Sequence, residues 1–265
     1  MSQRPSSPGL GELLVFGPPG AGVPLVTAGL VGLGIDALGW EGGPEPHPAL
    51  DGLNLEPGSP VLVALDASDG TLLTRSTPPW IADPPAATAG LAARSLDQAR
   101  ERLFPARVRS DLLLDSTHLS ERLLLARVRQ LEGFLRPERG GVAVVVETFS
   151  YPRGVPLDLG WCLDARALRN PYWEPGLRML SGLDYRVQEF VVSQPLATLI
   201  LDSTVQLLTS ILPELEARSR RVLRLGIGCT GGYHRSVALA EELARRIRPI
   251  GVEPLTWHRD LPERP

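Results

Sequence analysis

The amino-acid sequence predicts an α/β protein of two domains. Short apolar runs that are typical of buried strands alternate with longer segments that have helical periodicity. A strand, a glycine turn and a helix follow one another near the N-terminus and again at residues 222–248. Between the two halves, residues 136–141 form a polar, turn-rich junction. We therefore expect one domain at 1–139 and another at 140–265.

The first half contains three strands and three helices by this pattern. Asp66 closes one of the buried strands, and Ser116, Thr117 or Ser120 can cap the last helix. The expected elements are a strand at 13–16, a glycine turn at 17–22, a helix from Leu25 to Val31, a strand at 60–66, a helix at 91–102, a strand at 110–115 and a helix that ends at Leu135. A segment rich in Gly, Pro and acids at 41–60 separates the first helix from the second strand.

The second half contains continuous apolar runs that predict strands buried on both faces. Pro213 should lie near the end of its helix or kink it, and Pro249 should stop the last helix. The expected elements are strands at 142–148 and 161–166, a helix at 195–218, a strand at 222–228, a turn at 229–232 and a helix at 234–248.

Composition is that of an ordinary soluble globular protein. The 265 residues are 43% hydrophobic and 22% charged, and the net charge of −3 is not the footprint of a dedicated nucleic-acid binder. All 27 basic residues are arginines. The part from Gly140 onward has 15 arginines against 14 acids, and the part before it has 12 against 16, so a polyanion would prefer the second half.

Cysteine usage and hydropathy indicate a cytoplasmic protein. Cys162 and Cys229 stand in no metal-ligand spacing, so no metal site is expected. Residues 1–8 lack the apolar core of a signal peptide. The longest apolar stretch, 23–33, is shorter than the roughly 20 residues of a membrane span, so no membrane association is expected.

A candidate phosphate cradle lies at residues 229–236, with the sequence CTGGYHRS. Glycines stand where a strand turns into a helix, so successive backbone N–H groups can converge on an anion at the positive end of the helix dipole. Arg235 can then hold the anion through two hydrogen bonds. Alternatively, the glycines simply let the chain turn and Arg235 lies on a solvated helix face.

The spacing Cys-x5-Arg-Ser also matches the loop of cysteine phosphatases. In that loop a thiolate attacks phosphorus and the arginine holds the phosphate oxygens, roles that would fall to Cys229 and Arg235. No acidic loop can be assigned as the general acid, and Gly228 rather than His precedes the cysteine. The alternative is a buried, inert Cys229.

From Glu147 to the C-terminus, the sequence resembles the RapZ (YvcJ-like) family. The matching segments are ETFSYPRGVPLD at 147–158, LDAR at 163–166, NPYWEP at 170–175, SGLD at 181–184, IGCTGGYHRSV at 227–237, and His258 with Arg259. The resemblance implies a C-terminal domain that binds an amino-sugar phosphate and small regulatory RNAs. It places the following residues in the metabolite pocket: Asp164, Arg166, Cys229, Thr230, Gly231, Gly232, His234, Arg235 and Ser236, with Asn170 and Tyr172 nearby. Asp164 and Arg166 alone could equally form a structural ion pair.

The resemblance also implies an N-terminal P-loop nucleotide-binding domain with a parallel sheet. Its motif G-x-x-x-x-G-K-[ST] would align with Gly17, Gly20 and Gly22, but Val23 and Pro24 replace the lysine and the Ser/Thr. We therefore expect little or no ATP or GTP hydrolysis and no required cofactor, with ATP or GTP at most a weak ligand. Asp66, at the position of a magnesium-orienting carboxylate, is expected to be structural.

The leading hypothesis is a regulatory or adapter protein that senses a phosphorylated small molecule and conveys this to a protein or a small RNA. Family members are generally oligomeric, which implies a homo-oligomer. One alternative is a nucleotide- or phosphoester-hydrolysing enzyme. Another is an RNA-binding RNase adapter that uses surface arginines, listed here as Arg218, Arg220, Arg221, Arg224, Arg245, Arg246 and Arg248. Against it, the chain ends in DLPERP rather than in the basic tail of the best-known members.

Overall fold

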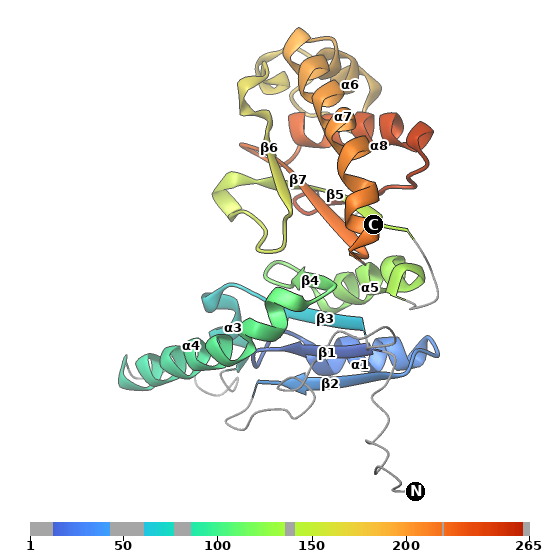
Figure 1. The fold of residues 1–265 in the computed structure, drawn as a ribbon. Helices are drawn as coiled ribbons and strands as arrows, with labels where there is room; N and C mark the ends of the chain where they lie inside the picture. Colours follow the sequence, from blue (N-terminus) through green and yellow to red (C-terminus); the bar gives the residue numbers. More distant parts are fainter. Residues whose placement is uncertain (1–12, 43–60, 77–85, 136–140, 219, 262–265) are drawn as a thin grey trace, which may run out of the picture. The chain divides into compact units, whose positions relative to one another are not determined.

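The computed structural model describes residues 13–42, 61–76, 86–135, 141–218 and 220–261. The chain divides into two compact units, residues 1–139 and 140–265. Each unit is built on a four-stranded, wholly parallel sheet with helices packed along it (Figure 1). The predicted α/β class with two domains is thereby confirmed.

The sheet of the N-terminal unit has the strand order β2-β1-β3-β4. Its strands are β1 (Leu13–Gly17), β2 (Ala37–Glu41), β3 (Val61–Asp66) and β4 (Leu112–Asp115), and its helices are α1 (Val23–Gly32), α3 (Asp69–Ser76), α4 (Ala86–Arg109) and α5 (Glu121–Leu135). Leu14 and Phe16 pack against α4, whereas Gly39, in register with Val15, faces Thr27 of α1. Because side chains alternate along a strand, helices cover both faces.

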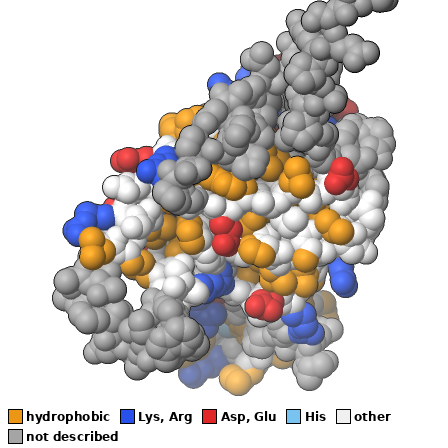
Figure 2. All heavy atoms as spheres, turned by 90° about the horizontal axis from the view of Figure 1, so that it is seen from below, with side chains coloured by type: hydrophobic (Ala, Val, Ile, Leu, Met, Phe, Trp, Pro, Cys, Tyr) orange, Lys and Arg blue, Asp and Glu red, His pale blue; other side chains and the backbone are white. Residues whose placement is uncertain are grey.

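The central strands β1 and β3 are buried along their whole length, which explains their continuous apolar sequences. At the edge of the sheet, β2 leaves Leu38 43% exposed. Figure 2 shows one face of the molecule on which hydrophobic side chains lie among scattered arginine and acidic side chains.

Helix α5 of the N-terminal unit begins at a serine cap. Ser120 Oγ accepts a hydrogen bond from Leu123 N at 3.3 Å, so Ser120 is the cap among the three candidates. The expected helix at 91–102 extends in both directions to become α4, with Pro105 inside it. β2 and α3 were not predicted; α3 contains Gly70 and two threonines, which are weak helix formers. Of the Gly/Pro-rich segment expected at 41–60, Glu41 ends β2, and residues 43–60 lie outside the described residues.

The sheet of the C-terminal unit has the order β6-β7-β5-β8. Its strands are β5 (Ala143–Ser150), β6 (Trp161–Asp164), β7 (Val222–Cys229) and β8 (Leu255–His258); its α-helices are α6 (Tyr185–Val192), α7 (Pro195–Ala217) and α8 (Arg235–Ile247); and short 3₁₀ turns occur at Tyr151–Arg153, Ala165–Ala167, Pro171–Trp173 and Arg248–Ile250. Pro249 lies in the last of these turns, immediately beyond α8. β8 and α6 were not predicted.

One face of this sheet packs against α6, α7 and α8 in a continuous apolar core. The other face is close to the segment that follows β5, because a Cβ built on Gly226 would meet the side chain of Leu159. Glycine in the middle of β7 therefore leaves room for Leu159 to pack closely against the sheet. By length and hydropathy α7 could cross a membrane; in the domain it packs Ala197, Leu201 and Leu208 into the core.

A buried group of ions lies on the second face of the C-terminal sheet. Arg224 of β7 donates to Glu147 of β5 and approaches Asp158 with Nη1–Oδ2 of 2.6 Å, and all three side chains are buried. The Trp257 ring lies 4.7 Å from the guanidinium carbon. Arg224 therefore does not belong to a basic surface, and its inclusion there was wrong: the alternation of β7 turns it inward.

We predict that Arg224→Leu destabilises the C-terminal domain by about 3–5 kcal/mol, because it removes the cation that neutralises two buried carboxylates. Chemical denaturation followed by circular dichroism measures this loss. Arg245→Leu is the matched control, since Arg245 pairs with Glu242 at the surface and should change stability little. Equal stability of the two variants would contradict the assigned role of Arg224.

Candidate functional site

The carboxyl ends of three adjacent strands meet in the C-terminal unit. The parallel register sets Ser150 of β5 beside Cys229 of β7, and Asp164 of β6 beside Gly228. Beyond these ends, residues 230–234 form a loop that leads into α8, with His234 at its N-cap. The predicted strand, glycine turn and helix therefore lie at one edge of the sheet, where α/β proteins commonly bind ligands.

The two loop glycines have different structural roles. Gly232 has φ of +63°, and a Cβ there would lie 2.8 Å from Asp260 Cβ, so both the backbone and the space require glycine. A Cβ on Gly231 would meet open space, and Thr230 and Gly231 are exposed. The loop thus has a packed side at Gly232 and an accessible side at Thr230 and Gly231.

Cys229 lies beneath the loop with 1% of its surface exposed. Its Sγ accepts a hydrogen bond from Gly232 N at 3.1 Å and lies 3.1 Å from Ser236 Oγ. These contacts tie the end of β7 to the first turn of α8. A thiol buried in this way is poorly placed to attack phosphorus, so the geometry favours the inert alternative.

Arg235 is buried and bound to protein acceptors. Its Nη1 donates to the backbone carbonyls of Arg166 and Leu168, both at 3.0 Å, and its Nη2 donates to Thr230 Oγ1 at 3.2 Å. The guanidinium therefore connects the loop to the turn that follows β6. Its direct contact with a phosphate stays a prediction.

His234 and Tyr233 fix the outer end of the loop. Tyr233 OH donates to Met179 O at 3.4 Å, and the two rings meet edge to face with centroids 4.9 Å apart. His234 Nε2 lies 3.0 Å from Arg178 O, a contact that a protonated Nε2 makes by donating. Burial lowers the pKa of His234 below its usual value, and the charge of Arg235 acts in the same direction.

Asp164 and Arg166 stand at the rim as a close ion pair. Arg166 Nη2 lies 2.7 Å from Asp164 Oδ2, Nε contacts both carboxylate oxygens, and the backbone N–H of Arg166 also donates to Asp164. The hydrogen bond from Arg166 holds the pKa of Asp164 below its usual range. Arg166 also stacks on Tyr151 at 3.9 Å, yet half of its side chain is exposed, so a ligand can reach it.

Asn170 and Tyr172, expected near the pocket, belong to the next turn of the chain. Asn170 caps the turn at Pro171–Trp173 by accepting from Tyr172 N, and Arg178 stacks on the Tyr172 ring at 4.2 Å. Their local roles are structural in the described contacts.

Three residues that sequence reasoning did not place in the site support the loop. Ser150 Oγ donates to Thr230 O at 3.0 Å, and Asp260 Oδ2 accepts from Ser150 N at 2.5 Å. Arg259 donates to the carbonyls of Gly154 and Ser150 and contacts Asp260. The family resemblance includes Arg259 but gives it no role in the pocket. Asp260 reaches the loop through the pairing of β8 with β5, a long-range contact that leaves no local signal in the sequence.

The glycine turn of the N-terminal unit is closed by its neighbours. Gly20 and Gly22 have φ of +82° and +100°, and Gly22 is the N-cap of α1, with Pro24 in the first turn. Ser116 Oγ donates to Ala21 O at 2.9 Å, and Arg75 Nη1 donates to Gly20 O at 3.3 Å. A Cβ on Gly17 would lie 2.5 Å from Leu65 O, so this glycine allows close packing of β1 and β3.

Asp66 ends β3 as expected, and its carboxylate is neutralised by arginines of α4. Arg100 Nη2 lies 3.2 Å from Oδ1, Arg107 Nη1 donates to Oδ2, and Ala67 N donates to Oδ1 at 2.8 Å. The carboxylate is buried. Within the described ranges, no group of three or more His, Cys, Asp or Glu side chains is placed to hold a metal ion.

The fold and the two loops define a class: two-domain α/β proteins in which each domain has a strand, a glycine turn and a helix in sequence. Residues 142–262 match the family model of the RapZ C-terminal domain. Together with the relatives below, this match shows that the chain belongs to the RapZ family.

Several bacterial proteins are similar to most of the chain. A nucleotide-binding protein of Corynebacterium jeikeium is 40% identical over 203 residues, which cover 76% of this chain and 68% of the relative. One of Alteromonas mediterranea is 35% identical over 203 residues, 77% and 72% of the two chains, and one of Thermobifida fusca is 37% identical over 201 residues, 76% and 67%.

We predict that a thiol reagent such as Ellman's reagent labels one cysteine rapidly in the native protein. Cys162 is exposed and Cys229 is buried, so rapid labelling should be lost in Cys162→Ser and retained in Cys229→Ser. Both thiols should react after unfolding in denaturant. Rapid labelling of Cys229 in the native protein would mean that this thiol is accessible. That result would favour the alternative of a cysteine phosphatase.

We also predict that acidification destabilises the protein partly through His234. Its folded-state pKa lies below the unfolded value of about 6.5, so the unfolded state binds a proton first. The stability that the protein gains from keeping His234 neutral is therefore fully present above about pH 6.5. This stability is lost as the pH falls further. Calorimetric unfolding between neutral and mildly acidic pH should show that His234→Gln loses less stability on acidification than wild type does. The control His118→Gln, at an exposed position, should lose as much stability as wild type.

Proposed function

We propose that the chain is a regulatory protein that senses a phosphorylated small molecule, of the amino-sugar phosphate class, at the loop between β7 and α8. The observation that supports this most is the position of the half-exposed Arg166 at the same sheet edge as the open side of the loop and the start of α8. A phosphate suits this edge because a helix N-terminus and a guanidinium both favour an anion.

The other polar groups suit a sugar. Asp164 keeps its negative charge over a wide pH range and is partly exposed, so it can accept hydrogen bonds from hydroxyl or amino groups. A neutral His234 that donates through Nε2 retains Nδ1 as an acceptor. Cys229, Arg235 and Ser236 then act by holding the loop, and Thr230 and Gly231 provide its exposed part.

Nucleotide binding at the N-terminal unit is proposed to be weak or lost. Several relatives are named nucleotide-binding proteins, but here Val23 and Pro24 replace the lysine and the Ser/Thr, and Asp66 is engaged by Arg100 and Arg107. Without these groups, magnesium and the β/γ-phosphates have few partners. We infer that this unit serves assembly, as a homo-oligomer, rather than hydrolysis.

We propose that the sensor conveys ligand binding to a protein partner rather than to a small RNA. Arg245 and Arg246 both pair with Glu242, Arg246 also lies 2.5 Å from Asp202, and Arg248 lies 3.4 Å from Glu253. Paired arginines release few counterions on binding a polyanion. A steep salt dependence of small-RNA binding would favour the RNase-adapter alternative.

We predict that glucosamine phosphate raises the melting temperature of the full chain and that Arg166→Gln removes most of this shift. A ligand at 100 times its Kd adds about 2.7 kcal/mol to the free energy of unfolding. Arg186→Gln is a matched control, because Arg186 pairs with Asp184 in the same local arrangement at a helix start. Differential scanning fluorimetry measures the melting temperatures of wild type, Arg166→Gln and Arg186→Gln with and without the ligand.

Two results would contradict the proposal. One is no stabilisation by any sugar phosphate at millimolar concentration. The other is an equal shift in Arg166→Gln and Arg186→Gln, which would place the ligand elsewhere. Stabilisation by ATP or GTP alone would move the ligand site to the N-terminal unit.

A further inference from the structure

Helix α7 of the C-terminal unit, orange in Figure 1, is long, apolar and largely exposed. From Pro195 to Pro213 its one charged residue is Asp202. Nevertheless, only 22% of its most apolar 18-residue part is buried within the described structure. A helix at the surface of a protein usually carries charged residues on the side that faces water. The outer side of α7 is therefore too apolar for a helix that faces only solvent.

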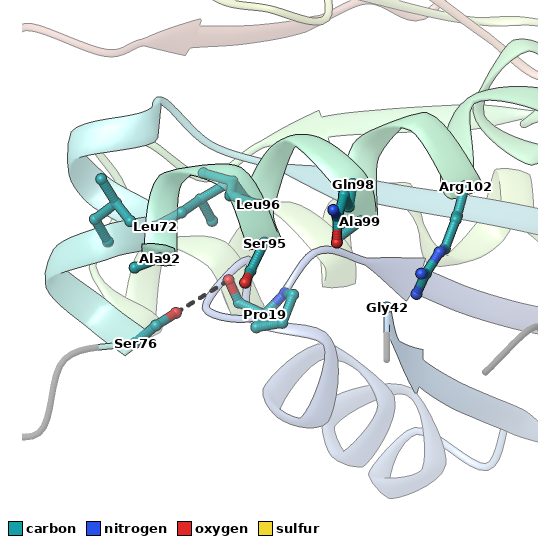
Figure 3. Close-up of a pocket in the computed structure, with 11 residues that line it drawn as sticks. Pro19, Gly42, Leu72, Ser76, Ala92, Ser95, Leu96, Gln98, Ala99 and Arg102 are labelled. Carbon is teal, nitrogen blue, oxygen red and sulfur yellow. Dashed lines mark hydrogen bonds between the residues drawn. The ribbon is translucent and has the colours of Figure 1, made fainter. Parts of the chain in front are cut away.

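Other helices of the chain have the usual polar outer side. Figure 3 shows Ser95, Gln98 and Arg102 along α4 of the N-terminal unit. In α8, which belongs to the same unit as α7, Glu242 pairs with Arg245 at the surface. The composition of α7 is therefore a local feature and not a property of all surface helices in this protein.

The exposed apolar residues of α7 lie along one side of the helix. Leu196, Leu199 and Leu207 are 40%, 62% and 49% exposed. Ser203 and Ser210, which are exposed too, lie on the same side, because steps of three, four and seven residues return to one face of an α-helix. We call these five residues the α7 stripe. Its two serines are small enough to let a second helix approach closely.

The two ends of α7 complement each other in charge. No side chain caps the N-terminus, because the Gln194 amide accepts from Arg169 N at 2.7 Å and donates to Phe190 O at 3.1 Å. Glu214 follows the stripe by four residues, and α7, which is described throughout, has no basic residue in its last turn. The helix dipole disfavours a carboxylate there and favours one at the N-terminus. An antiparallel second copy of α7 would bring Glu214 to the uncapped N-terminus.

We propose that two copies of the chain associate through antiparallel packing of their α7 stripes, about a two-fold axis near residue 205. Ser203 of one copy then lies opposite Leu207 of the other. Glu214 of each copy lies opposite Leu196, in the first turn of the other α7, so the contact is the same on both sides of the axis. The proposal rests neither on the sensor function nor on assembly through the N-terminal unit, so each can fail alone.

The test is chemical cross-linking of the full chain in a Cys162→Ser background, in which the remaining native thiol, Cys229, is buried. Ser203→Cys places a thiol on the stripe close to the two-fold axis. A short bis-maleimide should join two copies of this variant. Thr209→Cys is the matched control, because it lies on another exposed side of the same helix and should give at least tenfold less covalent dimer. Denaturing gel electrophoresis measures the yield.

A charge on the stripe should break the contact. In the Ser203→Cys variant, adding Leu207→Glu should lower the yield of covalent dimer at least tenfold, because the two-fold axis brings two unpaired carboxylates into an apolar interface. Thr209→Glu adds the same charge off the stripe and should leave the yield unchanged. Circular dichroism confirms that both variants are folded.

Three results would overturn the proposal. The first is equal yields of covalent dimer from Ser203→Cys and Thr209→Cys, and the second is a yield that Leu207→Glu does not change. The third is the absence of covalent dimer from Ser203→Cys. If the protein then floats with phosphatidylcholine vesicles, the stripe contacts a lipid surface instead of a second copy.

Discussion

The buried contact of Arg224 with Glu147 and Asp158 is the constraint on which the C-terminal domain depends. It joins β7 to β5 and to the segment that leads into β6. The carboxyl ends of these strands, β5, β6 and β7, form the site. Buried charges impose specificity because a shifted register would leave them without their partners. The parallel pairing then sets Ser150, Asp164 and Cys229 at one edge, and Arg235 and Ser150 fix the loop that follows.

The two domains show how the same local pattern can differ in chemistry. Both have a buried strand, a glycine turn and a helix. In the N-terminal domain, Val23 and Pro24 stand where the P-loop motif has its lysine and Ser/Thr, and arginines neutralise Asp66, which supports the proposal that nucleotide binding there is weak or lost. In the C-terminal domain, Thr230 and Gly231 stay exposed and Arg166 stands at the rim, an arrangement that supports the proposed sensor.

Much of the fold follows from local signals that the sequence carries. Continuous apolar runs predicted β1, β3, β5 and β7, and glycine turns located both loops. Short elements such as α3 and β8 were not found because their stability comes from packing rather than propensity. The burial of Arg224 and the role of Asp260 could not be predicted either, since both depend on partners 77 and 110 residues away in the sequence.

The most direct test of the sensor account is the response of the backbone amides to a ligand. Two-dimensional NMR of the isotopically labelled full chain, titrated with glucosamine phosphate, reports each N–H group separately. The account predicts saturable shifts confined mainly to residues 230–237 and to Arg166. Shifts concentrated at residues 17–24, or no shifts at millimolar ligand, would contradict it.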